Sequence, residues 1–214
     1  MESKNLIENE SLDAKYVFKI LMIGDSEVGK SQLISTLINQ EYHEEYSKTE
    51  NIEIYEAFFM IESILIKLNI WDMGAEENLL AFLKGKSAQV FRNVSSILLI
   101  FDVCNLNSFE RLTYWNNFIK TNINQNIPII IVGNKIDNEM NRVVSTSDIM
   151  NIADDFGYAF ITTSAKDNFN VERMFEMAAE ELKRIAEEQL LIINHPPTKN
   201  NIENRNPGPC CTCI

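Results

Sequence analysis

The sequence predicts an α/β domain in three layers, with a mostly parallel sheet of about six strands and helices on both faces. From residue 94 to residue 190, short apolar runs alternate with stretches of helical periodicity. This alternation is typical of parallel strands joined by helices. A further apolar run, residues 16–23, leads directly into the sequence GDSEVGKS at residues 24–31. That sequence is a phosphate-binding loop signature, and it stands between a predicted strand and a predicted helix, as such a loop must.

The length and composition suit one globular domain with two tails. The chain has 214 residues, of which 45% are hydrophobic and 23% are charged. We expect a domain over residues 16–190, a flexible tail over 1–15 and a disordered tail over 191–214. The net charge of −12 argues against binding to nucleic acid and against general electrostatic attachment to anionic membranes. The first fifteen residues lack the features of a signal peptide, and the apolar runs are too short to span a bilayer, so we expect a cytosolic protein.

The predicted elements follow one another in a regular order. The predicted strands cover residues 16–23, 52–61, 64–71, 94–103, 127–132 and 159–163, and the predicted helices cover 32–39, 108–121, 147–156 and 171–190. The short junction between the second and third strands predicts a hairpin, and therefore one antiparallel pair. Polar residues 40–50 predict an exposed loop, and residues 73–89 predict a loop with helical turns.

The glycine-rich loop predicts a site for the phosphates of a nucleotide. Its backbone N–H groups and the start of the following helix converge on one phosphate chain. Lys30 is expected to reach the β- and γ-phosphates, and the Ser31 hydroxyl is expected to bind Mg²⁺. The other loop residues expected at the nucleotide are Gly24, Ser26, Glu27, Val28, Gly29 and Gln32. The loop alone does not identify the base.

Two segments at the ends of later strands predict that the base is guanine. Ligands of parallel sheets bind at the carboxyl ends of the strands, and the sequence NKID, residues 134–137, follows the strand at 127–132. The Asp137 carboxylate can accept hydrogen bonds from the ring N–H and the amino group of guanine, a donor pair that adenine lacks. The Lys135 stem can lie along the purine, and Asn134 can connect this segment to the phosphate-binding loop. Backbone N–H groups of a second segment, Ser164, Ala165 and Lys166, can meet the guanine carbonyl oxygen.

Together these motifs resemble the Ras-like small GTPases over residues 16–190, and the Rab branch most of all. The resemblance rests on YVFKILMIGDSEVGKS at 16–31, KLNIWD at 67–72, NKID at 134–137 and TSAK at 163–166. It implies the P-loop fold of small G proteins, binding of GTP or GDP with Mg²⁺, and hydrolysis of GTP to GDP and phosphate. It also implies a role in vesicle trafficking.

The resemblance assigns roles to three further residues. Thr49 lies 19 residues after Lys30 and 23 before Asp72, at the place of the first-switch threonine. This implies that Thr49 contacts Mg²⁺ and the γ-phosphate, and that Asp72 contacts Mg²⁺ through water. Tyr42 stands where the family packs an aromatic ring against guanine, although an exposed loop tyrosine is an alternative interpretation.

The chain departs from the family pattern at residues near the phosphates. The second switch usually begins DTAGQE, and here Ala75 and Glu76 replace the glycine and the glutamine. Glu76 takes the place that orients the attacking water, but a carboxylate has no N–H to donate and adds negative charge beside the transition state. We therefore expect slow intrinsic hydrolysis. Glu27 replaces another glycine, and it either weakens nucleotide binding or points outward into solvent.

Other departures concern partners. Residues 50–54 differ from the Rab pattern, and the stretch between Asp72 and Phe91 is about four residues longer than usual. The resemblance implies a monomer with an exchange factor, a GTPase-activating protein, a prenylation escort or GDP-dissociation inhibitor, and effectors. Because the departures lie where effectors bind, the sequence does not identify these partners.

The cysteines predict two different roles. Cys104 lies in a predicted core strand and is expected to act as a small hydrophobe. Cys210 and Cys211, near the end of the chain, match the double-cysteine prenylation site of Rab proteins, while residues 211–214 also fit a loose C-a-a-X motif. Residues 187–214 carry three acidic and two basic side chains, a net charge of −1, so no basic patch supports a single lipid. We therefore expect two geranylgeranyl groups and reversible attachment to the cytosolic face of an internal membrane.

Three hypotheses remain open from the sequence. The first is a Rab-like GTP-hydrolysing switch, and the second is a GTP-loaded scaffold that does not hydrolyse. The third is an ATP-using P-loop kinase or ATPase, which requires ATP to compete with GTP.

Overall fold

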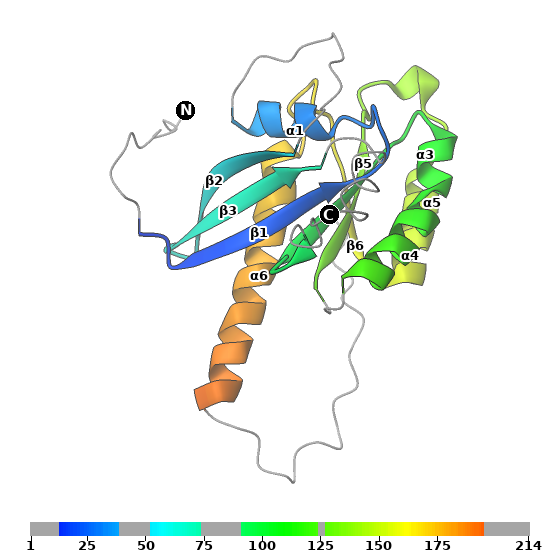
Figure 1. Ribbon diagram of the computed structural model, residues 1–214. Helices are drawn as coiled ribbons and strands as arrows, with labels where there is room; N and C mark the ends of the chain where they lie inside the picture. The colour runs from blue at the N-terminus through cyan, green and yellow to red at the C-terminus, as the bar shows by residue number, and fades with distance from the viewer. Residues whose placement is uncertain (1–12, 39–51, 74–90, 124–126, 195–214) are drawn as a thin grey trace.

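A six-stranded sheet runs through the protein in the computed structural model, which describes residues 13–38, 52–73, 91–123 and 127–194 (Figure 1). The strands are β1 Tyr16–Ile23, β2 Glu53–Ile61, β3 Ile64–Asp72, β4 Ser96–Asp102, β5 Ile129–Asn134 and β6 Ala159–Thr162. Their spatial order is β2-β3-β1-β4-β5-β6. All six strands agree with the sequence prediction to within two residues at each end.

The strands pair in parallel except at one edge. β1 is parallel to both β3 and β4, β4 is parallel to β5, and β5 is parallel to β6. β2 and β3 form the predicted antiparallel hairpin, which turns at Glu62 and Ser63. The carboxyl ends of five strands therefore lie at the same edge of the sheet, where ligands of this fold class bind.

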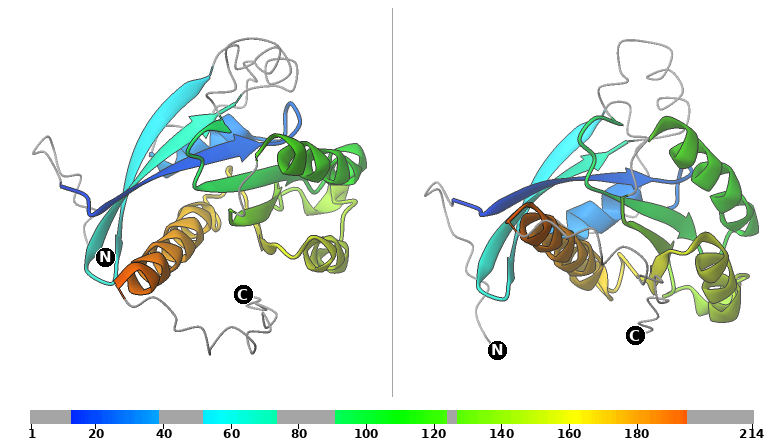
Figure 2. Two further views of the ribbon diagram at one scale, coloured as in Figure 1. Left: turned by 60° about the horizontal axis from the view of Figure 1, so that its bottom comes forward. Right: turned by 90° about the horizontal axis from the view of Figure 1, so that it is seen from below.

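Helices cover both faces of the sheet, as predicted. They are α1 Lys30–Leu37, α3 Leu106–Glu110, α4 Leu112–Asn122, α5 Thr146–Phe156 and α6 Val171–Asn194, with a short 3₁₀ helix, η2, at Glu139–Asn141. α1 and α6 pack on one face, and α4 and α5 pack on the other (Figure 2).

Successive side chains of β1 point to opposite faces of the sheet, and this explains the two hydrophobic layers. Ile20 and Met22 point into the layer shared with α1 and α6, and Leu21 and Ile23 point into the layer shared with α4 and α5. All four side chains are buried because both faces are covered by helices. This is why the central strands read as continuous apolar runs rather than as alternating ones.

Three details differ from the sequence prediction. The single helix expected over 108–121 is divided at Arg111 into α3 and α4, and α3 starts earlier because Asn105 caps it by accepting a hydrogen bond from the Ser108 N–H. α6 continues four residues past the expected end, to Asn194. Cys104 is half-buried in a turn after β4 and does not lie in the strand, because the Asp102 carboxylate accepts the Cys104 N–H and turns the chain.

Several expectations lie outside the described residues. These are the N-terminal tail over 1–12, the loop over 40–50, the segment over 74–89 and the C-terminal tail from residue 195. Among the helices that the structure describes, none has both the length and the apolar character needed for a bilayer span.

Candidate nucleotide-binding site

The phosphate-binding loop connects β1 to α1 and depends on two glycines. Gly24 has φ 153°, and a Cβ there would lie 2.1 Å from the Ile100 carbonyl oxygen of β4. Gly29 has φ 96°, and a Cβ there would lie 2.4 Å from Nδ2 of Asn134. The loop is thus pressed against two other segments of the site, and only glycine fits at these two positions.

Glu27 has an unusual backbone conformation within this loop. Its φ of 65° lies in the left-handed region, which residues other than glycine enter at a cost. Its side chain is exposed, and its carbonyl oxygen accepts a hydrogen bond of 2.6 Å from Lys135 Nζ. A glycine at this position would adopt the conformation without strain.

Lys30 is buried at the start of α1, beneath the loop. Its Nζ donates to the carbonyl oxygens of Gly24 at 2.9 Å and Asp25 at 2.7 Å. Burial lowers the pKa of Lys30 to about 8, although the negative charges of Asp72 and Asp25 oppose this shift. The ammonium group is therefore held inside the loop, where a phosphate would neutralise its charge.

The two predicted Mg²⁺ ligands in the described residues lie together. The Ser31 hydroxyl, in the first turn of α1, donates a hydrogen bond to Oδ2 of Asp72 at the end of β3. Asp72 is fully buried, and the parallel pairing of β1 with β3 brings it beside Met22, two residues before the loop. A hydroxyl and a carboxylate are oxygen ligands of the kind that Mg²⁺ prefers.

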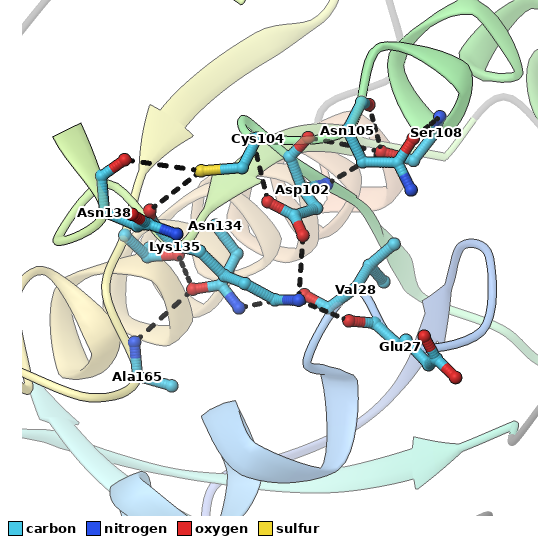
Figure 3. A network of polar contacts seen from close by, with 11 residues as sticks. Glu27, Val28, Asp102, Cys104, Asn105, Ser108, Asn134, Lys135, Asn138 and Ala165 are labelled. Atoms are coloured by element: carbon cyan, nitrogen blue, oxygen red, sulfur yellow. Dashed lines mark hydrogen bonds and ion pairs between the residues drawn. The ribbon is translucent and has the colours of Figure 1, made fainter. Parts of the chain in front are cut away.

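Asn134 joins three segments of the candidate site (Figure 3). Its Nδ2 donates to the Val28 carbonyl oxygen in the phosphate-binding loop at 2.9 Å. Its Oδ1 accepts from Thr163 Oγ1 at 3.1 Å and from the Ala165 N–H at 3.3 Å. This buried amide therefore fixes the phosphate-binding loop, the 134–137 segment and the 163–166 segment relative to one another.

Lys135 and Asp137 are held in place by charged and hydroxyl partners. Lys135, at φ 70°, reaches across to the phosphate-binding loop, and its Nζ also forms an ion pair of 2.8 Å with Asp102 (Figure 3). Asp137 Oδ1 accepts a hydrogen bond of 2.7 Å from the Ser164 hydroxyl, which itself accepts the Asp167 N–H. The carboxylate predicted to recognise guanine is therefore oriented by the segment predicted to meet the guanine carbonyl oxygen.

The remaining predicted residues divide into two groups. Ser26 and Lys166 are exposed, Gln32 is half-buried in α1, and Val28 is buried beneath the loop. Tyr42, Thr49, Ala75, Glu76, Cys210 and Cys211 lie outside the described residues.

Asp102 lies at the site but was not predicted from the sequence, and Thr163 lies in the predicted 163–166 segment but its side-chain bond to Asn134 was not predicted. Asp102 ends β4 and pairs with Lys135, 33 positions along the chain, and Thr163 supports Asn134. Neither residue forms part of a local motif with its partner. The sequence signal that could have indicated these two side-chain roles is the position of both residues at strand ends, where the other site residues also lie.

The donor set fits a magnesium-bound nucleoside di- or triphosphate. The loop holds the buried Lys30 ammonium group, Ser31 and Asp72 bring a hydroxyl and a carboxylate oxygen together, and Asp137 has carboxylate oxygens that can accept hydrogen bonds from a base. The described residues therefore bring the predicted phosphate, magnesium and base segments to one edge of the sheet.

Comparisons with known proteins agree with this geometry. The model of the Ras family matches residues 19–184. Ras-related protein RABA2a of Arabidopsis thaliana is 30% identical over 209 residues, covering 92% of this chain and 94% of that protein. Ras-related protein RIC1 of Oryza sativa subsp. japonica is 35% identical over 184 residues, covering 86% and 89%, and RABD1 of Arabidopsis thaliana is 32% identical over 169 residues, covering 79% and 80%. The chain belongs to the Ras family of small GTPases and is Rab-like within it.

Proposed function

We propose that this small GTPase is a Rab-like switch that binds GTP and GDP with Mg²⁺, hydrolyses GTP slowly and regulates intracellular membrane trafficking. The observation that carries the nucleotide assignment is the Asp137 carboxylate, which Ser164 orients beside a phosphate-binding loop fixed by Asn134. The trafficking role is supported by similarity to proteins named as Rab-type relatives.

The residues of the site have distinct tasks in binding. Lys30 exchanges its two carbonyl partners for phosphate oxygens, and the gain of a negative partner favours its protonated form. Ser31 would bind Mg²⁺ directly and Asp72 would bind it through water, and the cation would supply positive charge beside the β- and γ-phosphates. Lys135 covers the purine while Asp102 keeps its ammonium group in place.

The switch itself involves segments outside the described residues. We infer that Thr49 and residues 72–77 are ordered by the γ-phosphate and released after hydrolysis. Tyr42 would stack against guanine. The GTP-bound and GDP-bound states would be recognised by an exchange factor, a GTPase-activating protein and effectors. Residues 50–54 depart from the Rab pattern, which implies that the contacts of these partners differ from those of other Rab proteins.

Two residues of the second switch support a second candidate function. Ala75 and Glu76 replace the glycine that senses the γ-phosphate and the glutamine that orients water. A chain with these residues and no hydrolysis would be a GTP-loaded scaffold rather than a cycling switch. Electrostatic repulsion between Glu76 and the phosphates gives the direction of the effect on the rate.

Single-turnover release of γ-phosphate separates the two functions. The protein is loaded with GTP, and phosphate release is followed for the wild type and for Glu76→Gln. The switch predicts measurable wild-type turnover that rises by at least about tenfold in Glu76→Gln, because an orienting N–H donor returns and a negative charge is removed. No turnover in the wild type over many hours would support the scaffold.

We also propose that Cys210 and Cys211 carry two geranylgeranyl groups. The segment from 187 to 214 has a net charge of −1, so electrostatic attraction to anionic lipids does not assist a single chain. Intact-mass measurement of protein made in a eukaryotic host tests this proposal directly. Two prenyl groups are expected, and a mass showing none or one would contradict it.

A further inference from the structure

A second anchor of the phosphate-binding loop lies on the side of the loop that faces α4. Asp25 is the second residue of the loop, and its carboxylate points toward α4. Oδ1 of Asp25 accepts hydrogen bonds from Arg111 Nε and from Trp115 Nε1, each 2.8 Å long. The three side chains therefore form a clamp between the loop and the first turn of α4, which we call the Asp25 clamp.

The α4 side of the clamp is firmly fixed. Trp115 is 2% exposed, and its ring makes an edge-on contact with the ring of Phe118 at a centroid separation of 5.7 Å. Arg111 precedes Trp115 by four positions, so both side chains lie on the same face of the helix. Because the indole N–H is buried, it needs an acceptor, and Asp25 supplies it.

The loop side of the clamp leads directly to the phosphate site. The carbonyl oxygen of Asp25 accepts a hydrogen bond from Lys30 Nζ at 2.7 Å, so the residue that α4 holds is one of the two whose carbonyl oxygens position the lysine. The loop also contains two glycines and the strained Glu27, all with positive φ. Glycines are free to take other conformations, so keeping their N–H groups directed at a phosphate requires restraint from outside the loop.

We propose that Arg111 and Trp115 are positioning residues for the β-phosphate of the bound nucleotide. Acting through Asp25, they hold the phosphate-binding loop in its binding conformation and thereby set the rate at which nucleotide dissociates. The proposal rests on the proposed function, since it assumes that the site binds guanine nucleotides. It adds a determinant on α4, outside the loops that contact the nucleotide.

The test measures dissociation of N-methylanthraniloyl-GDP from the full-length protein with Mg²⁺ present. Trp115→Phe keeps an aromatic side chain and removes the N–H donor, Arg111→Gln removes the charge, and Asp25→Ala removes the shared acceptor. Tyr158→Phe is the matched control, because it removes a hydrogen bond of 2.7 Å to Asn116 on the same helix α4 that does not involve the loop. The midpoint of unfolding with GDP bound is recorded for each variant, so loss of folding is detected separately.

We expect dissociation to accelerate about tenfold in Trp115→Phe and in Asp25→Ala, as the loss of a charge-assisted hydrogen bond implies. Arg111→Gln should accelerate it in the same direction, and Tyr158→Phe should stay within about twofold of wild type. The Asp25→Ala/Trp115→Phe double variant should be no faster than Asp25→Ala, since both act through one contact. Affinity for guanosine, measured by competition, should be unchanged in every variant because guanosine has no phosphate for the loop to bind.

Other results would contradict the proposed role of the Asp25 clamp. Dissociation within about twofold of wild type in both Trp115→Phe and Asp25→Ala would show that the contact does not position the loop. Equal acceleration in Tyr158→Phe, or an equal loss of affinity for guanosine, would show that α4 acts only through general stability. Failure of the wild type to bind the labelled GDP at all would instead contradict the proposed function, so the two failures are distinguishable. If Trp115→Phe does not fold, the Asp25→Ala and Arg111→Gln data decide the question.

Discussion

At the scale of single residues, a backbone conformation and a buried charge both destabilise the nucleotide-free phosphate-binding loop. Glu27 is held at φ 65° by the shape of the loop, and an L-residue in the left-handed region is disfavoured by about 1 kcal/mol. Lys30 loses its hydration to sit beneath the same loop, which lowers its pKa. Both features make the nucleotide-free loop less stable than it would be with phosphate bound or with a glycine at position 27.

Replacing Glu27 with glycine should therefore stabilise the protein. We expect Glu27→Gly to raise the free energy of unfolding of the nucleotide-free protein by about 1 kcal/mol, and to slow GDP dissociation because a carboxylate near the phosphates is removed. Denaturant unfolding and labelled-GDP release measure the two effects. Asn93→Gly, at φ 56° and outside the site, is the control and should change stability less, since asparagine tolerates this conformation. A less stable Glu27→Gly protein would contradict the strain at this position.

Nucleotide binding should be coupled to protonation of Lys30. With a pKa of about 8, this lysine is half protonated at pH 8 in the nucleotide-free protein, and phosphate favours the charged form. We expect proton uptake when GDP binds at pH 8 and smaller uptake at pH 7, with affinity falling as the pH rises above 8. Calorimetry in buffers of different ionisation enthalpy measures the uptake. Release of protons at pH 8 would show that Lys30 is not the coupled group.

The lowered pKa of Lys30 makes the free energy of unfolding rise with pH, whereas it makes nucleotide affinity fall with pH. The folded, nucleotide-free protein binds fewer protons than the unfolded chain between about pH 8 and the ordinary lysine pKa of 10.5. Its free energy of unfolding should therefore gain a contribution from Lys30 as the pH rises through that window.

At the scale of elements, the strands were easier to predict than the helix ends. β4 and β5 are buried on both faces and read as continuous apolar runs, so their positions follow from composition alone. The break between α3 and α4 was missed because Arg111 has helical backbone angles and the apolar stripe continues across it. The Asn105 cap was a local signal that could have placed the start of α3 correctly.

The start of α5 provides a test of a single element. Ser145 and Asp148 form a capping box, in which the Ser145 hydroxyl accepts the Asp148 N–H and the Asp148 carboxylate accepts the Ser145 N–H. Ser145→Ala should lower the free energy of unfolding by about 1 kcal/mol, measured by denaturant unfolding. Asn151→Ala, at an exposed position of the same helix, should change it by less than about 0.5 kcal/mol. Equal effects of the two substitutions would exclude a role for the cap.

At the scale of the whole molecule, the parallel sheet assembles the site from distant parts of the chain. β1, β3, β4 and β5 each end beside a site residue or loop, and Asn134 links three of the segments through one side chain. The sequence motifs predicted the phosphate and guanine segments because each is local. The partners of Lys135 and Asp25 lie 33 and about 90 positions away, so only the folded sheet and its covering helices bring them together.

The central claim is that this assembled site selects guanine nucleotides, and competition for labelled GDP tests it most directly. Unlabelled GTP and GDP should displace the label at near-stoichiometric concentration, whereas ATP should be weaker by about 10⁴-fold because it leaves the Asp137 carboxylate without its donors. Asp137→Ala should lose most of this preference while keeping the phosphate-binding loop. Displacement by ATP as effective as that by GTP, unaffected by Asp137→Ala, would contradict the account.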